Sequence, residues 1–167
     1  MANLSPKSGP YAARIVGGSI IPVETQLEAS SVSFKVGAPL VFSSGYLTEC
    51  TSPVTTAAHP TVGLAMRAGN NDTNHSSLKY IPAYQEIVFA GYLMASSGGN
   101  SVDTHTLAQT DIGSTMNLAK DGVSGLWFLD FSTTTNGGVI IIDNIDPIGT
   151  TKQALVLFKF PNASTSY

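Results

Sequence analysis

Three runs near the end of the chain read Leu126-Trp-Phe-Leu-Asp-Phe131, Val139-Ile-Ile-Ile-Asp143 and Ala154-Leu-Val-Leu-Phe-Lys-Phe160. Each run is short and rich in β-branched or aromatic residues, which is typical of strands. The segments between them, Ser132–Gly138 and Asn144–Gly149, carry the Gly, Asn and Pro residues that favour turns. We therefore predict an antiparallel meander that supplies much of the core.

The last of these runs has two mostly apolar faces. Successive side chains of a strand point to opposite sides. One face carries Ala154, Val156, Phe158 and Phe160, and the other carries Leu155, Leu157 and Lys159. We expect this strand to be covered on both sides.

Short apolar runs separated by turn signals also occupy the preceding part of the chain. The expected strands are Gln26–Val36, Leu40–Phe42, Tyr46–Thr48, Val62–Met66, Lys79–Pro82 and Gln85–Met94. Gly63 predicts a bulge or a close approach of the backbone. Thr104–Lys120 is the one region compatible with a short helix, although Gly113 disfavours it. This pattern predicts an all-β fold, either a compact antiparallel β-barrel or a β-sandwich.

The first 25 residues are expected to form an extended N-terminal arm before a single β domain over residues 26–167. Prolines and paired glycines disfavour a regular element here; they are Pro6, Pro10, Gly17, Gly18 and Pro22. A disordered tail is the alternative. Two apolar islands, Ile15-Val16 and Ile20-Ile21, favour an arm that is pinned to a surface.

The composition restricts the classes of function. The chain has 167 residues, of which 43% are hydrophobic and only 11% charged, with a net charge of −3. About a quarter charged is usual, so either Ser, Thr and Asn cover the surface or much of it is buried in an oligomer or on a partner. No Lys/Arg cluster indicates a nucleic-acid partner. No apolar run reaches the roughly 18 residues of a membrane span, and no signal-peptide core is evident, so we expect cytosolic synthesis without secretion.

Catalytic and metal-binding motifs are not evident. No Gly-x-Ser-x-Gly elbow is present, and the lone Cys50 is expected to be an inert, partly buried thiol. The histidines are widely spaced and are expected at the surface; they are His59, His75 and His105. Two Asx-rich segments, Asn70–Asp72 and Asp143–Asp146, have the oxygens that calcium prefers, but turn hydrogen bonds explain them better. We expect no enzyme activity, no cofactor and no metal.

Several segments resemble the head decoration (cement) proteins of tailed bacteriophages. They are Gly37-Ala-Pro-Leu-Val-Phe-Ser-Ser-Gly45, Val62-Gly-Leu-Ala-Met-Arg-Ala-Gly69, Ile81-Pro-Ala-Tyr-Gln-Glu-Ile-Val-Phe-Ala90, Leu107-Ala-Gln-Thr-Asp-Ile-Gly113, Trp127-Phe-Leu-Asp130 and Val156-Leu-Phe-Lys-Phe160. The resemblance implies a β-barrel or β-sandwich that is made in the host cytoplasm and trimerises on the outer surface of the virion capsid. Its partner would be the major capsid protein, and the family has no catalytic residues.

Candidate contacts with the capsid or between subunits are apolar residues of the arm and tyrosines around one predicted hairpin. They are Ile15, Val16, Ile20, Ile21, Tyr80, Tyr84 and Tyr92. Tyrosine is enriched at interfaces, although these tyrosines would also fit inside a barrel. The main alternative is a trimeric receptor- or carbohydrate-binding tip module of a phage tail or head fibre, with Ala68–Ser77 as its site. A small hydrolase on a β fold is a third hypothesis.

Overall fold

The protein is built almost entirely from β-strands, as predicted. Its structure is a computed structural model that describes residues 4–15, 20–51, 61–102, 104–132 and 137–161. The described residues form twelve strands and one short 3-10 helix, η1 (Gln109–Asp111). Within these ranges, no helix has the length and apolar character to cross a bilayer.

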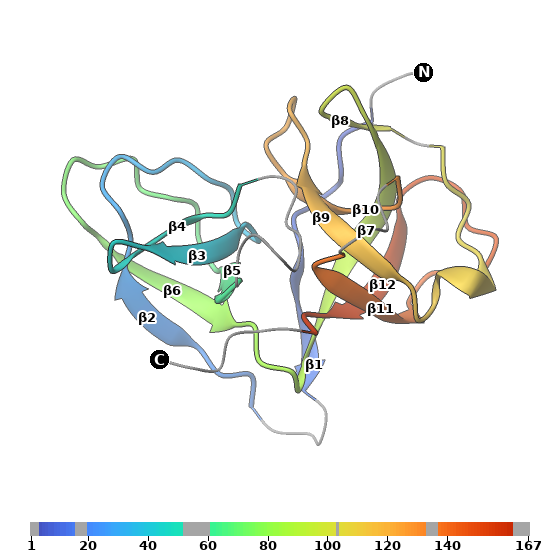
Figure 1. Cartoon of the computed structure of the whole chain (residues 1–167), viewed down its shortest axis with the longest axis horizontal. Helices are drawn as coiled ribbons and strands as arrows, with labels where there is room; N and C mark the ends of the chain where they lie inside the picture. Colours follow the sequence, from blue (N-terminus) through green and yellow to red (C-terminus); the bar gives the residue numbers. More distant parts are fainter. Residues whose placement is uncertain (1–3, 16–19, 52–60, 103, 133–136, 162–167) are drawn as a thin grey trace.

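A closed barrel of five strands forms one side of the molecule (Figure 1). Its order around the barrel is β7, β10, β9, β11 and β12, and β12 pairs with β7 again. The parallel contact between β7 and β10 is the exception among antiparallel neighbours. The barrel strands are β7 (Ile87–Ser97), β9 (Thr115–Lys120), β10 (Trp127–Asp130), β11 (Val139–Asn144) and β12 (Ala154–Lys159).

A second, antiparallel sheet lies beside the barrel (Figure 1). Its outer strands β2 and β4 approach each other, because Glu28 forms a parallel bridge with Leu47. This sheet therefore curls towards closure. In spatial order its strands are β2 (Glu24–Leu27), β6 (Ser77–Pro82), β5 (Gly63–Ala65), β3 (Pro39–Ser43) and β4 (Tyr46–Glu49).

The barrel and the second sheet share one hydrophobic core. Leu40 and Tyr80 of the sheet belong to the same buried cluster as Phe89 and Trp127 of the barrel. A polar contact joins the two units as well: Glu49 of β4 accepts hydrogen bonds from Trp127 Nε1 (2.7 Å) and from Lys120 Nζ (2.6 Å). The two units therefore pack as one body.

Two further strands extend the sheet at β7. Strand β1 (Tyr11–Ile15) runs antiparallel to residues 87–90 of β7, and β8 (Asn100–Val102) pairs with residues 95–97. Leu4, which precedes β1 in the sequence, packs on the outer surface of the barrel beside Met94 and Phe128. The first part of the arm is therefore extended and lies against its own barrel.

The predicted meander is wrong in its order. Strands β11 and β12 do form an antiparallel pair, but β9 lies between β10 and β11. Strand β9 occupies part of the region considered for a helix, where only the 3-10 turn is helical. Gly113, with φ of +89°, follows this turn. Met116 and Leu118 then point into the main core while Ala119 packs on the opposite side, which is the alternation of a strand.

The expected strand over residues 26–36 is also wrong. Only β2 is regular, and Ser31 has a φ of +57° that ends extended structure there. The next prediction is confirmed, because β3 and β4 form a tight hairpin. Strand β12 has the expected double burial: Val156 and Phe158 face the main core, and Leu157 packs against Val88 and Ala90 in a separate cluster.

Two glycines allow close approaches that a side chain would prevent. A Cβ atom at Gly63 would lie 2.3 Å from the carbonyl oxygen of Ile81 on the adjacent strand, which confirms the approach predicted there. A Cβ atom at Gly91 would lie 2.5 Å from Leu129 Cδ1. Gly91 thus makes room inside the barrel for Leu129 and for Phe158, which would also contact that Cβ at 3.1 Å.

A buried carboxylate, Asp121, ties the N-terminal segment to the barrel. It accepts hydrogen bonds from the hydroxyl of Ser5 (2.9 Å), the backbone of Ser101 (2.9 Å) and both the backbone and the hydroxyl of Ser124 (2.8 and 2.6 Å). Burial alone would raise the pKa of Asp121, but the hydrogen bonds outweigh it and lower the pKa from 3.8 to about 2. The folded state therefore favours the ionised form.

We predict a stability contribution from Asp121 that depends on pH. Because the folded-state pKa is lowered, the contribution is complete above about pH 4 and is lost as the pH falls towards 2. At pH 7, Asp121→Asn is expected to lower the free energy of unfolding by about 1 to 3 kcal/mol. Urea unfolding at a series of pH values measures the difference in free energy of unfolding between the native protein and the Asp121→Asn variant. A difference that stays constant from pH 7 to pH 2 would contradict the assignment.

Candidate interaction surface

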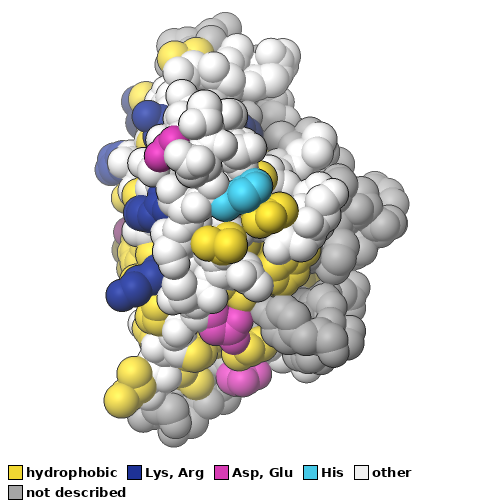
Figure 2. Space-filling view, turned by 90° about the vertical axis from the view of Figure 1, so that its left-hand side faces the viewer, with side chains coloured by type: hydrophobic (Ala, Val, Ile, Leu, Met, Phe, Trp, Pro, Cys, Tyr) yellow, Lys and Arg dark blue, Asp and Glu magenta, His cyan; other side chains and the backbone are white. Residues whose placement is uncertain are grey.

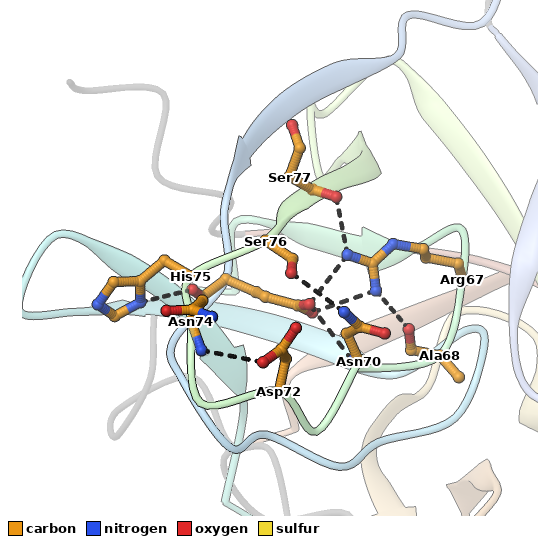
Figure 3. A network of polar contacts seen from close by, with 9 residues as sticks. Arg67, Ala68, Asn70, Asp72, Asn74, His75, Ser76 and Ser77 are labelled. Atoms are coloured by element: carbon orange, nitrogen blue, oxygen red, sulfur yellow. Dashed lines mark hydrogen bonds and ion pairs between the residues drawn. The ribbon is translucent and has the colours of Figure 1, made fainter.

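An ion pair between a buried acid and a partly exposed arginine organises the polar loop over residues 68–76 (Figure 3). Glu28, which is only 1% exposed, lies against the guanidinium of Arg67, with 2.9 Å between Nη2 and Oε1. Arg67 also donates hydrogen bonds to the backbone oxygens of Ala68 and Ser77, both at 2.7 Å. The same side chain thus neutralises Glu28 and holds both ends of the loop.

The loop has its own internal hydrogen bonds. Asn70 donates its backbone N–H to Glu28 (3.3 Å) and its amide group to Ser76 (3.1 Å). The carboxylate of Asp72 accepts the backbone N–H of Asn74 at 3.2 Å, which is the turn geometry expected for Asx residues. Among the described residues, no group of three or more His, Cys, Asp or Glu side chains is arranged to hold a metal ion.

An aromatic pair borders this loop. The rings of Tyr46 and His75 stack with 3.7 Å between centroids and 6° between planes. His75 Nδ1 also lies 3.0 Å from the backbone oxygen of Glu28. The stack therefore sits on the ordered loop and on the β3–β4 hairpin.

A shallow hollow lies over the outer face of β2 and β6, next to the ion pair. Its volume is about 410 Å³, and we call it the β2–β6 hollow; it is lined by Thr25, Met66, Arg67, Ser77 and Lys79. Met66 in its lining is exposed, and so are Val23 and Leu27, two residues before and after Thr25 in the chain. Figure 2 views the left-hand side of the molecule as drawn in Figure 1, and basic and hydrophobic side chains lie close together along its left edge.

The arm residues predicted as contacts lie in different environments. Ile15 is half-buried in β1, and Ile21 is half-buried after it. Ile20 is 93% exposed, the most exposed large hydrophobic side chain among the residues that the structure describes. Val16 lies outside the described residues.

The three predicted tyrosines do not form one surface. Tyr80 is only 2% exposed, and its hydroxyl donates to Glu24 at 2.5 Å while Tyr84 donates to the other oxygen of the same carboxylate. An outward contact by Tyr80 is therefore a wrong prediction, because its ring belongs to the core. Tyr92 is half-buried on the barrel, where Lys7 Nζ lies 5.9 Å from its ring centroid.

The remaining residues considered for chemistry are held in structural contacts. His105, expected at the surface, is mostly buried and pairs with Asp111 at 2.7 Å, so that prediction is wrong. Burial raises the pKa of the Cys50 thiol to about 12, while a hydrogen bond with Thr61 opposes this rise and Glu49 adds to it. Cys50 is thus buried and protonated, in line with the inert thiol predicted. His59 lies outside the described residues.

The sequence reasoning missed the structural roles of Glu24, Glu28 and Asp121, of which Glu28 and Asp121 are buried and Glu24 is half-buried. Glu24 and Glu28 are four residues apart in a chain where charged residues are scarce. A rare charge inside a strand pattern is the signal that could have identified them, since isolated acids are seldom buried unless they are paired.

Comparison with known proteins identifies no relative: no protein-family model matches the chain, and no curated protein matches it. The candidate surface therefore rests on its geometry.

We predict that Arg67→Met destabilises the fold, because Glu28 would remain buried without its partner. The free energy of unfolding is expected to fall by about 2 to 3 kcal/mol. This is less than for a fully enclosed ion pair, because the Arg67 side chain is 38% exposed. Urea unfolding followed by circular dichroism measures it. Lys35→Met is the control, since it removes an exposed cation. Equal midpoints for both variants would refute the role of the pair.

Proposed function

We propose that the protein is a virion structural protein that decorates the outer surface of an icosahedral phage capsid. It binds between major capsid subunits as a homotrimer and braces neighbouring subunits against separation. The protein acts by binding alone, with no enzymatic step and no cofactor. Its partners are copies of itself and the major capsid protein.

The observation that carries the proposal is the outward position of Ile20. Its side chain is 93% exposed and is followed by the exposed side chain of Val23, in a chain with only 11% charged residues. Removing such side chains from water favours association by about 1.5 to 3 kcal/mol each. The barrel supplies a rigid body from which these contacts are presented.

Multivalency explains how weak single contacts suffice. A trimer presents each contact three times, and linked binding events raise the overall avidity by orders of magnitude. Separation of capsid subunits would have to break several contacts together. The resistance to expansion therefore scales with the number of contacts made.

A second candidate function is a trimeric receptor- or carbohydrate-binding tip module. It is favoured by the Tyr46–His75 stack beside the ordered loop, because flat aromatic surfaces next to polar groups suit sugar rings. In this case the loop over residues 68–77 binds the ligand, and the arm has no part in it.

We predict that Ile20→Asp weakens capsid binding at least about tenfold, since a charge replaces an apolar contact. Co-sedimentation with purified expanded capsids of the encoding phage measures it. Val123→Asp is the matched control, because Val123 is also exposed but lies in the turn between β9 and β10. Failure of the native protein to co-sediment would refute the proposal, and retention on a glycan array would then support the second candidate.

A further inference from the structure

We propose that copies of this chain associate head to tail: the turn between β11 and β12 of one copy docks in the β2–β6 hollow of the next. This inference rests on the homo-oligomer of the proposed function and identifies the surfaces that build it. The two surfaces are complementary in apolar character and in charge.

The β2–β6 hollow offers an apolar floor with one available cation. Thr25 and Lys79 face each other as a cross-strand pair on its floor, with Leu27 and Met66 exposed nearby. The guanidinium of Arg67 is already occupied by Glu28, Ala68 and Ser77. Within the part of the chain that the structure describes, Lys79 has no ion-pair partner, so its ammonium group is the charge that a ligand would meet.

The turn over residues 143–149 has the opposite character. Its side chains Ile145 and Ile148 are exposed. Asp143 and Asp146 supply two carboxylates at its start, and Lys152 follows only near the end of the connection to β12, so the connection keeps an excess negative charge. An apolar tip with negative charge beside it matches an apolar hollow with a lysine. Electrostatic complementarity of this kind selects the partner and its orientation.

The turn is already ordered before any contact. Asn144 Nδ2 donates to the backbone oxygen of Asp146 (2.8 Å), and the Asp146 carboxylate accepts the backbone N–H of Leu155 (2.8 Å). Gly149, with φ of +92°, turns the chain within this connection, and Lys152 and Gln153, also at positive φ, lead into β12. Docking therefore requires little ordering, which keeps the entropic cost of association low.

The two surfaces lie at opposite ends of the molecule. In Figure 1, β2 and β6 are at the left of the long axis, and β11 and β12 are at the right. One chain cannot join its own two surfaces, so the contact forms between copies. Contacts of this heterologous type generate rings when the rotation closes and open filaments when it does not; the proposed function requires the closed ring of three.

The test is a charge exchange followed by light scattering over a concentration series of the full chain. Lys79→Glu and Asp143→Lys are each expected to raise the dissociation constant of the oligomer about tenfold, because like charges then meet. The variant with both substitutions should return to within roughly threefold of the native value. Ile148→Ser, without any charge change, should also weaken association. Lys35→Glu is the control for a change of net charge and should have no effect.

Thermal unfolding of each variant confirms that the fold is kept. A native protein that stays monomeric throughout the series would overturn the inference, and so would a double variant as weak as the single ones. Capsid co-sedimentation of the same proteins separates this failure from that of the proposed function. Monomers that still bind capsids would refute the head-to-tail contact and leave the decoration role standing.

Discussion

Both edges of β7 are hydrogen-bonded: β12 runs along one edge, and β1 and β10 share the other. This double pairing closes the barrel, because β10 and β12 are the ends of the run that continues through β9 and β11. The chain enters β7 directly from β6 of the second sheet. A single strand therefore connects the N-terminal segment, the barrel and the sheet, and the positions of all candidate surfaces depend on it.

Three acidic side chains hold segments in place that the hydrophobic core alone does not position. Glu24 joins β2 to Tyr80 of β6 and to Tyr84 in the connection to β7. Glu28 holds the polar loop, and Asp121 holds the N-terminal segment. Each is satisfied by several donors, which offsets the cost of burying its charge. These acids are therefore used in contacts within the molecule, and they add little charge to the exposed surface.

Local chemistry predicted the elements better than their arrangement. The alternation of side chains between the two faces of β12 and the close backbone approach at Gly63 could be predicted, because the signal for each lies in a few neighbouring residues of the sequence. The position of β9 between β10 and β11 was not, since it depends on pairing between distant segments. In the candidate surface, Ile20 is exposed, as an arm contact requires, whereas Tyr80 is buried and donates a hydrogen bond to Glu24, a residue that the sequence patterns did not single out.

Native-state hydrogen exchange of β7 tests this description most directly. If β7 closes the barrel, the amides of residues 89–93 exchange only when the whole protein unfolds, and their free energy of exchange equals that of global unfolding. The amides of the polar loop exchange through smaller, local openings. Exchange of the β7 amides at a much lower free energy than global unfolding would contradict the account, because the barrel would then open without unfolding the rest.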